Sequence, residues 1–478
     1  MSTAAHIGGP LGCIGLAGLL VGRWRTLRLA GLAAWALGAI LLAAYLAPAG
    51  HHVVLAVAGV LGAALAVAGA PWLRRSPWLL AFATLLLVPA RIPVTVGDVD
   101  ANLLIPLYVV VGAAAVELFW AILHGDERRG ELGLVAWPLA AFVVWTGLSL
   151  SWTLDLQQGS IELLFFYLPF GVLALCLARL PWEPAQLPRL LVQLVAMGLV
   201  FAIVGIYQEA ARDVFWNPKV IVGDVYQSFF RVNSLFWDPS IYGRFLVVAI
   251  LASLVVALRR IGSPVFWAAA GAICVLWAGL LFSYSQTSFA SLLACVLVAV
   301  GGTLRWRPAP ALVTASLVAA LVLVLPQRTP ASPHVATGVV AVTSGRGKLI
   351  TEGVKIALDH PLGGVGVGGF KHSYANRVGL RGAEPQRAAS HTTPVTVAAE
   401  TGVVGFGLFL WLAVAVFLVA FRRAGPGRVG EAAFVLGLIL LAIAAHSLGY
   451  ADLFEDPMAW AALGLALCVA RAPREAHT

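Results

Sequence analysis

Arginines and one histidine are the side chains whose type and surroundings could do chemistry in this sequence. Arg231 and Arg244 flank an Asp-Pro step, Arg346 lies in a Ser-Gly-Arg-Gly-Lys run, and His391 precedes a long apolar stretch. Guanidinium groups bind phosphate oxygens through paired hydrogen bonds, and a neutral imidazole accepts a proton near pH 7. The pattern predicts arginines that converge on a diphosphate and a histidine that acts as a base.

Arg346 lies where a helix is predicted to begin. The apolar residues after it recur at helical spacing and end before a His-Pro step: Leu349, Ile350, Gly353, Val354, Ala357 and Leu358. This spacing predicts an amphipathic helix on the membrane surface or over a cavity, with Lys348–Glu352 and Lys355–Asp359 pairs on its polar side. The helix N-terminus and flanking glycines favour an anion at Arg346. The alternative is a solvated arginine on a basic loop.

His391 is predicted to lie at a helix N-terminus, because a Thr-Thr-Pro step and a long apolar run follow it. The positive end of a helix dipole disfavours a charged imidazole, so this position favours the neutral form that a base requires. The alternative is a surface residue or a helix cap.

Arg244 stands about one turn inside an apolar helix that follows Asp238. An arginine within a membrane helix is costly, so a partner or a water-filled cavity is expected. It could join Arg231 and Arg346 at a diphosphate, or its side chain could extend to the membrane interface.

Two short motifs are typical of other kinds of site. Residues 364–369 match GxGxxG, but no strand precedes them and no βαβ unit surrounds them, so we expect a tight glycine turn instead of a dinucleotide site. Asp98 and Asp100 form a DxD that could hold a divalent metal beside a phosphate, although acidic turns are common without metal. No HExxH or comparable zinc spacing occurs, and we predict neither a metal nor a cofactor.

The chain around these residues has the composition of a membrane protein. Of its 478 residues, 60% are hydrophobic and 11% are charged, whereas soluble domains carry about 25% charge. We therefore expect an all-α polytopic integral membrane protein with about 12–15 transmembrane helices. This excludes a secreted enzyme or a nucleic-acid-binding domain, despite the net charge of +9. The predicted spans are 7–22, 27–47, 52–70, 78–92, 103–123, 133–150, 160–178, 189–210, 241–258, 264–282, 285–303, 309–325, 402–421, 430–448 and 456–471.

Basic residues predict the orientation of the spans. One set of alternate short loops holds 18 of the 31 basic residues and the opposite set holds four, which places the first set and the C-terminus in the cytoplasm. The predicted order is 1–210 N-terminal transmembrane helices, 211–240 outer loop, 241–325 transmembrane helices, 326–401 large extracytoplasmic catalytic loop between the twelfth and thirteenth runs, and 402–478 C-terminal transmembrane helices. The large loop holds eight basic and four acidic residues, which favours an anionic ligand.

Three stretches together resemble the O-antigen ligase and polymerase superfamily of bacterial envelope glycosyltransferases. The similarity covers about residues 225–420 and keeps the family's order, spacing and sidedness, in the stretches Arg231 to Ser240, Ser344 to Gly366, and His391 with Ala398 to Gly405. Two positions depart from the family pattern. An arginine expected in the region 283–288 is missing, and Thr392 follows His391 where the family has asparagine.

The resemblance implies metal-independent, inverting transfer of a glycan from a polyprenyl (undecaprenyl) diphosphate to an acceptor hydroxyl on the outer face of the bacterial plasma membrane. It implies His391 and Arg346 as catalytic residues, and it implies four residues that bind the diphosphate or substrate: Arg231, Arg244, Lys348 and Asp238. The expected partners are the lipid-linked donor, the bilayer, and a glycan, lipid or wall-polymer acceptor. A surface polysaccharide ligase is favoured over a repeat-unit polymerase.

Two further classes of protein stay open as alternatives. A transporter or flippase of lipid-linked glycans also needs many spans and basic cavity residues, but it would show repeats of the hydropathy pattern and interrupted helices. A metal-dependent polyprenyl-phosphate glycosyltransferase would use Asp98 and Asp100, and a chelator would stop it.

Overall fold

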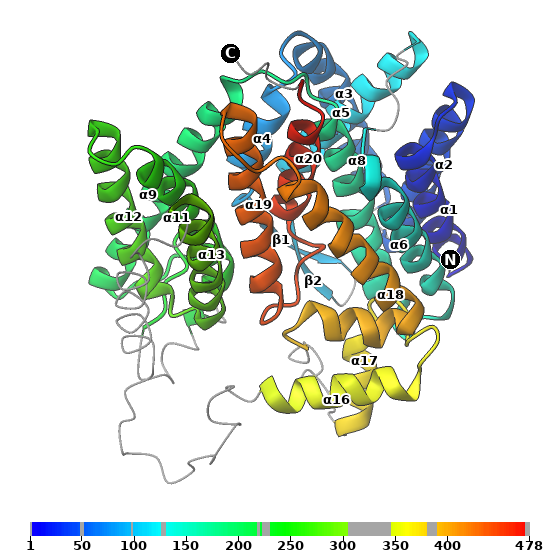
Figure 1. Ribbon diagram of the computed structural model, residues 1–478. Helices are drawn as coiled ribbons and strands as arrows, with labels where there is room; N and C mark the ends of the chain where they lie inside the picture. The colour runs from blue at the N-terminus through cyan, green and yellow to red at the C-terminus, as the bar shows by residue number, and fades with distance from the viewer. Residues whose placement is uncertain are drawn as a thin grey trace.

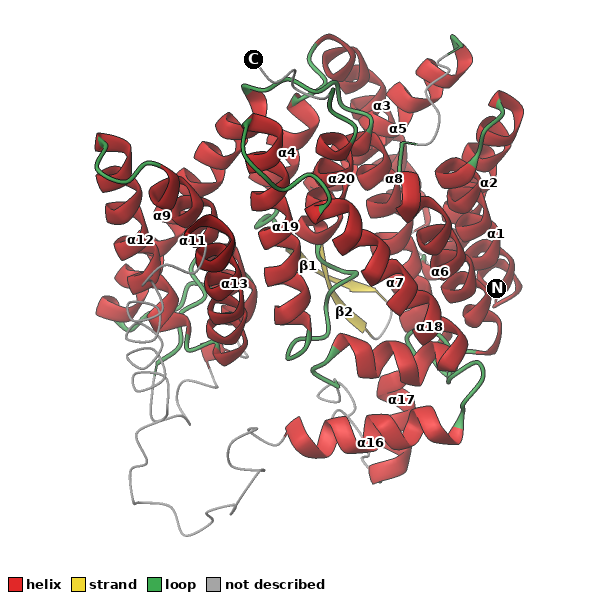
Figure 2. Cartoon of the chain, in the orientation of Figure 1, coloured by secondary structure: helices red, strands yellow, loops and turns green. Residues whose placement is uncertain are grey.

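The computed structural model describes residues 2–47, 52–96, 99–125, 131–217, 220–221, 230–304, 346–379 and 390–473. Figure 2 shows that these residues are mostly helical. The elements are α1 (Ser2–Val21), α2 (Arg25–Leu46), α3 (His52–Arg75), α4 (Leu79–Leu87), β1 (Ile92–Val96), β2 (Val99–Leu103), α5 (Ile105–Leu123), η1 (Gly133–Val135), α6 (Ala136–Ser149), η2 (Leu150–Trp152), α7 (Leu156–Glu162), the π-helical η3 (Leu163–Tyr167), α8 (Leu168–Ala178), α9 (Gln186–Ala211), α11 (Pro239–Arg259), α12 (Pro264–Ser283), α13 (Gln286–Leu304), α16 (Arg346–Asp359), α17 (Phe370–Val378), α18 (Thr393–Phe421), α19 (Arg428–Ser447) and α20 (Pro457–Ala470).

Eleven helices in the described ranges are long and apolar enough to cross a membrane, and two shorter apolar helices accompany them. The prediction of an all-α polytopic membrane protein is thereby confirmed. In Figure 1, α9, α11, α12 and α13 form one group, α1, α2, α6 and α8 lie on the other side, and α19 and α20 stand between them. The predicted span 309–325 lies outside the described residues.

The predicted span 78–92 is wrong. Helix α4 has only nine residues, and an antiparallel hairpin of β1 and β2 follows it. Pro89 and Pro93 cannot donate a helical hydrogen bond, and the alternating Ile92, Val94 and Val96 favour an extended chain. Since Asp98 lies outside the described residues and the structure does not describe the Asp100 side chain, the DxD alternative stays untested.

The first two helices pack through glycines. A Cβ on Gly38 of α2 would lie 2.3 Å from the amide nitrogen of Gly12 in α1, and a Cβ on Gly15 would lie 2.2 Å from the amide of Trp35. Small residues allow membrane helices to approach until their backbones touch. This close contact buries much of α1, which begins near the start of the chain.

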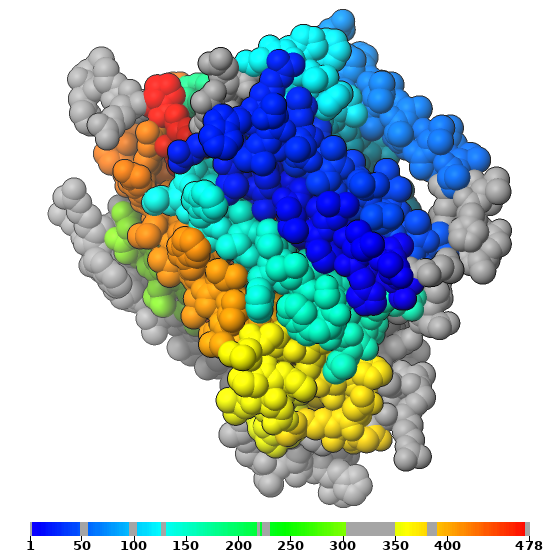
Figure 3. Space-filling view, turned by 90° about the vertical axis from the view of Figure 1, so that its right-hand side faces the viewer, coloured from blue at the N-terminus to red at the C-terminus, as the bar shows by residue number. Residues whose placement is uncertain are grey.

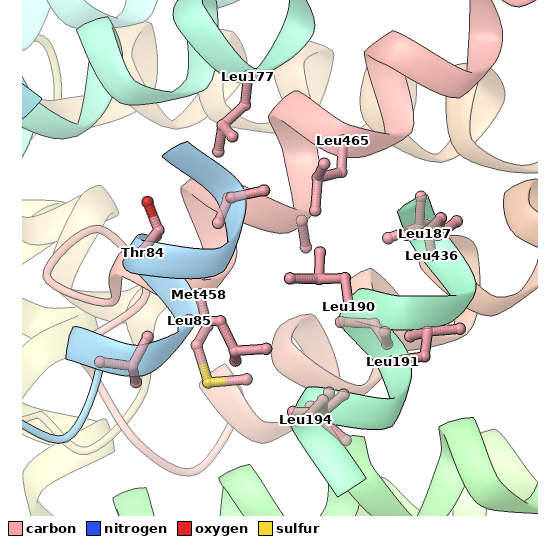
Figure 4. Close-up of a pocket in the computed structure, with 16 residues that line it drawn as sticks. Thr84, Leu85, Leu177, Leu187, Leu190, Leu191, Leu194, Leu436, Met458 and Leu465 are labelled. Atoms are coloured by element: carbon pink, nitrogen blue, oxygen red, sulfur yellow. The ribbon is translucent and has the colours of Figure 1, made fainter. Parts of the chain in front are cut away.

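Apolar side chains from α4, α9, α19 and α20 meet where the two helix groups join. They surround a small cavity of about 60 Å³, with Leu190, Met458 and Leu465 among its lining residues (Figure 4). Of the residues that line the cavity, Thr84 alone has a polar side chain, and its hydroxyl donates to Leu80 O at 2.7 Å. The junction therefore rests on apolar packing.

Residues 360–369, called the glycine turn below, pack against the first part of α18. The amides of Val365 and Gly366 donate to carbonyl oxygens of that helix, both at 2.9 Å, and the acceptor of Gly366 is Glu400. Gly364 has a φ of 66°, and a Cβ there would lie 2.3 Å from the carbonyl carbon of Glu400. The prediction of a tight turn that brings the backbone close to other groups is confirmed.

The other side of the glycine turn is bonded to the segment between α6 and α7. Thr153 Oγ1 donates to Val367 O at 2.7 Å, and the amide of Val367 donates to Ser149 Oγ at 3.1 Å. Trp152 Nε1 donates to Gly363 O at 3.1 Å. These bonds join residues 211 to 218 positions apart and fix the glycine turn to the N-terminal half of the bundle.

Helix α18 breaks at Gly402, where φ is 66° and ψ is −169°. This conformation is essentially restricted to glycine, and a Cβ would lie 2.2 Å from Leu362 O. The amide of Val403 donates to Pro361 O at 2.7 Å. The break lets the first part of α18 lie across the lower end of the bundle while the rest rises into it (Figure 1), and it falls where the sequence predicts a span to start.

Helix α16 lies below the bundle with α17, and both project in the space-filling view (Figures 1 and 3). It packs through Gly353 and Ile356 against α17 and the first part of α18. A second apolar row stays exposed, with exposed fractions of 36% for Ile350, 44% for Val354 and 70% for Leu358. The apolar stripe predicted from the sequence combined residues of the buried row and of the exposed row, and it did not include Ile356. An exposed apolar row suits a helix at a membrane surface.

Arg377 of α17 joins two carboxylates of α16. It donates to Glu352 Oε2 at 2.8 Å and also to Asp359. Lys355 pairs with Glu352 at 2.8 Å, so the predicted Lys355–Asp359 pair is wrong because a neighbouring helix supplies the partner. Lys355 and Arg377 together hold the pKa of Glu352 below its usual value. The Lys348 side chain lies outside the described residues, which leaves its predicted pair untested.

We expect Gly402→Ala to destabilise the junction of α18 with the glycine turn. The new Cβ meets Leu362 O, and forcing an ordinary residue into this backbone region costs about 1–3 kcal/mol. Gly407→Ala is the matched control, since Gly407 lies in the same helix with nothing within 4 Å of an added Cβ. Thermal unfolding of both variants in detergent checks the prediction, and equal midpoints would contradict it.

Candidate active site

The partner that Arg244 requires comes from the loop between α19 and α20. Its guanidinium donates to both carboxylate oxygens of Asp452, at 2.6 and 2.9 Å, and a third contact of 3.2 Å reaches Asp456 Oδ2. Arg244 is only 1% exposed. The expectation that an intramembrane arginine has a partner is confirmed.

Burial and neighbouring charges shift the pKa values of the two carboxylates in opposite directions. Burial would raise the pKa of Asp452, but the nearby guanidinium outweighs it and holds this pKa below its usual value. Burial, together with the charge of Asp452, raises the pKa of Asp456. Asp452 therefore carries the charge that balances Arg244. These surroundings favour a structural clamp between α11 and the α19–α20 loop over a direct contact of Arg244 with a diphosphate.

The same loop, residues 448–456, contacts several other elements. Thr287 Oγ1 of α13 donates to Gly449 O at 3.4 Å, and Thr393 Oγ1 of α18 donates to Tyr450 O at 3.5 Å. A guanidinium nitrogen of Arg91 donates to the backbone oxygen of Glu455 at 3.5 Å. The loop thereby brings the starts of α11, α13 and α18 to one end of the bundle.

Arg231 lies along the C-terminal end of α12. Its Nε donates to Ser283 O at 3.1 Å, and the amide of the next residue, Val232, donates to Phe282 O at 3.1 Å. The segment is also tied to α9, because the amide of Ser234 donates to Gln208 Oε1 at 2.7 Å. Arg231 is half-buried, and the bonds of this segment to α12 and α9 hold the backbone around it.

Asp238 caps the helix that carries Arg244. Its Oδ1 accepts from the amide of Ser240 at 2.7 Å, and Pro239 occupies the first helical position. Asp-Pro at a helix start is a common capping pattern. The cap accounts for an aspartate here, and a contact of Asp238 with substrate stays a prediction.

His391 lies two residues before the start of α18, as predicted. It has a left-handed backbone with φ of 56° and is half-buried. Ser390 Oγ donates to Thr392 O at 2.9 Å and accepts from the amide of Thr392 at 3.2 Å. Non-glycine residues in this conformation persist where the surroundings fix them, and they are frequent at functional sites.

Arg346 is the first described residue of α16, and the helix itself is confirmed. Since residues 341–345 lie outside the described residues, the predicted helix start stays a prediction. The side chains of Arg346 and Lys348 lie outside the described residues. Convergence of Arg231, Arg346 and His391 on one ligand therefore stays a prediction. Figure 1 places α16 and the first part of α18 at the same end of the molecule.

Sequence reasoning missed the 448–456 loop. Asp452, Glu455 and Asp456 lie between the last two apolar runs, and carboxylates at the end of a membrane helix are uncommon enough to note. Because a partner for Arg244 was expected, these three carboxylates could have been identified from the sequence as candidates for it. Burial and the charge of Asp452 raise the pKa of Glu455.

Residues 271–410 match the family described as O-antigen ligase. The matched segment contains the greater part of α12, together with α13, α16, α17, the glycine turn, His391 and the break at Gly402, whereas Arg231 and Arg244 precede it. The resemblance to the O-antigen ligase superfamily is thereby confirmed, and the many apolar helices agree with a multi-pass membrane protein. No curated protein shows a significant match to the chain.

We expect Arg244→Ala to destabilise the protein strongly, by about 3–5 kcal/mol, because it leaves buried carboxylates without their counter-charge. The paired variant Arg244→Met with Asp452→Leu removes both charges and should cost less than Arg244→Ala alone. Thermal unfolding of the purified variants measures both effects. Near-normal stability of Arg244→Ala would show that the clamp is unimportant for the fold.

Proposed function

We propose that this member of the O-antigen ligase superfamily is a surface polysaccharide ligase. It moves a glycan from a polyprenyl diphosphate to an acceptor hydroxyl on the outer face of the plasma membrane. One observation carries the proposal: the matched segment contains both Arg346, at the start of α16, and His391, just before α18. The glycine turn lies between these two helices in the chain and is bonded to α18.

An apolar groove supports a lipid-linked donor. It has a volume of about 400 Å³ and is lined by side chains of α6, α18, α19, α20 and the loop before α20. Pro394, at the start of α18, lines the groove three residues beyond His391, and Phe409 and Trp460 line it further along. A polyprenyl chain in this groove would bring its diphosphate near His391.

The proposed reaction is a single displacement at the anomeric carbon. The acceptor oxygen attacks this carbon as the bond to the diphosphate breaks, and His391 takes the hydroxyl proton. Arg346 and Arg231 neutralise the charge that develops on the leaving polyprenyl diphosphate, with Lys348 as a further cation. No step requires a metal, and inversion at carbon follows from one displacement.

A repeat-unit polymerase of the same superfamily is the second candidate, because both activities use the same donor chemistry. Mass spectrometry of envelope glycans from a deletion strain distinguishes them. Complete chains left on the carrier lipid indicate a ligase, whereas single unpolymerised repeat units indicate a polymerase. Loss of transfer in EDTA, restored by magnesium or manganese, would favour the metal-dependent alternative based on Asp98 and Asp100.

Arg346→Ala should abolish transfer while leaving the protein folded, because an arginine at the start of a peripheral helix contributes little to stability and much to a desolvated diphosphate. Arg346→Lys should restore activity poorly, because the lysine ammonium cannot donate the two parallel hydrogen bonds that a guanidinium donates to a phosphate. Arg377→Lys is a control on the neighbouring helix. The measurement is glycan transfer by purified protein, and a wild-type rate for Arg346→Ala would refute the assignment.

His391→Ala should slow transfer by about 10²- to 10⁴-fold, the usual effect of losing a general base. His391→Gln tests the role: it should be nearly as slow if the imidazole takes the proton, and appreciably active if the imidazole only orients the hydroxyl. The wild-type rate should fall as acid protonates the imidazole, because protonation removes its acceptor lone pair. A normal rate with weakened donor binding in His391→Ala would instead place this residue in the diphosphate site.

A further inference from the structure

The apolar groove between α18, α19 and α20 has a definite length. These three helices contact one another (Figure 1). On α19 the lining residues run from Leu440 to Leu448, at the C-terminal end of the helix, and at 1.5 Å per residue they span about 12 Å. On the spanning part of α18 they run from Phe409 to Phe417, which is the same number of residues. The groove therefore covers less than half of the ~30 Å hydrocarbon core of a bilayer.

Helices α18 and α19 come into close contact just beyond one end of the groove. A Cβ on Gly437 of α19 would lie 2.8 Å from the ring of Phe421 in α18, and the rings of Phe421 and Phe434 are 6.5 Å apart. Gly437 precedes Leu440 by one turn of α19, and Phe421 follows Phe417 by one turn of α18. The contact therefore lies where the lining residues stop on both helices, and it closes the groove between them.

The opposite end of the groove is walled by aromatic rings and lies beside the start of α18. The ring of Phe454 stacks on that of Phe142, with their centroids 4.9 Å apart. Phe454 belongs to the 448–456 loop, to which Thr393 of α18 donates a hydrogen bond, and Pro394 lines the same groove. A prenyl chain whose diphosphate lies near His391 would enter the groove at this end.

The groove is open along one side. Leu410 of α18 and Leu448 after α19 line it, and they are 48% and 61% exposed. In a membrane, leucines exposed in this way face lipid chains, which are as apolar as the leucines themselves. A bound chain that is longer than the groove can therefore leave it sideways into the bilayer.

The volume of the groove sets how much of a prenyl chain it can hold. This volume is about 400 Å³, which gives room for about 13 non-hydrogen atoms at the ~30 Å³ that one water occupies in the liquid. An isoprene unit has five carbon atoms, so the groove holds about two to three units.

We propose that the protein recognises about three isoprene units of its donor, those nearest the diphosphate, and that the contact of Phe421 with Gly437 sets this limit. The inference rests on the proposed function, because it takes the groove as the site of the donor's prenyl chain. Each unit inside the groove gains van der Waals contacts with the protein, whereas each later unit keeps the lipid contacts that it has before binding. Affinity should therefore rise with chain length only until the groove is full.

Dimethylallyl, geranyl, farnesyl, geranylgeranyl and undecaprenyl diphosphate, which carry one, two, three, four and eleven units, test this proposal. Their binding to the purified full-length protein in detergent is measured, with dissociation constants corrected for partition of each ligand into protein-free micelles. We expect affinity to rise roughly tenfold or more from dimethylallyl to farnesyl diphosphate, and to change less than about twofold with longer chains.

Each other outcome has a separate meaning. Affinity that keeps rising up to eleven units would overturn the length limit and leave the proposed function standing. Affinity that is the same at every length would also overturn the inference, because the groove would then belong to lipids of the bilayer. Failure of all five diphosphates to bind would contradict the proposed function and the inference with it.

Two substitutions in α18 test whether the groove is the site. Ala413→Phe fills the groove and should abolish the gain in affinity between dimethylallyl and farnesyl diphosphate. Val414→Phe is the matched control, because Val414 is the next residue, is 57% exposed and does not line the groove. The same gain in both variants would refute the groove as the site of recognition.

Phe421→Ala tests what sets the limit, because it removes the ring that closes the groove. Geranylgeranyl diphosphate should then bind about threefold more tightly than farnesyl diphosphate, since a fourth unit gains contacts with the protein. An unchanged limit in a folded Phe421→Ala protein would show that this contact does not set it.

Discussion

A helix within a membrane can break only where other groups bond the backbone atoms that the break exposes. The glycine turn meets this requirement at Gly402, because Pro361 O accepts from the amide of Val403 and the preceding turn of α18 accepts amides of residues 365 and 366. The glycine turn is itself bonded to Ser149 and Thr153. The glycine turn and the first part of α18 are therefore held by one connected set of hydrogen bonds, and His391 lies two residues before α18.

The second organising interaction is electrostatic. Arg244 and Asp452 neutralise one another inside the bundle, and their pairing holds the 448–456 loop against α11. Because that loop also contacts Thr393 of α18, the clamp connects the segment that carries Arg231 with the segment that carries His391. At this end of the bundle Arg244 therefore has a structural role, whereas the role proposed for Arg231 and Arg346 is chemical.

Patterns that repeat along the chain predicted most of the fold. Apolar runs located the spans, helical spacing located α16, and the Thr-Thr-Pro step located the start of α18.

The errors have local causes. Residues 78–92 are apolar enough for a span, but hydropathy does not register that two prolines stop the helix. Ile356 and the Lys355 pair were missed because α17 and α18, which cover one face of α16, follow it in the chain. Asp452 could be anticipated only as an unnamed partner for Arg244, since pairing across 208 residues leaves no trace in local spacing.

The bonds of the glycine turn also bear on how the protein is assembled. Thr153 and Val367 are 214 positions apart, and α18 follows later still. Chains emerge from the ribosome N-terminus first, at roughly 5–20 residues per second, so α6 and α7 wait for tens of seconds in the membrane before their partner is made. During that interval Val367 is absent, so Ser149 and Thr153 have not yet formed their bonds to it. A truncated product that ends before residue 360, however many spans it has inserted, lacks the glycine turn and so cannot form these bonds.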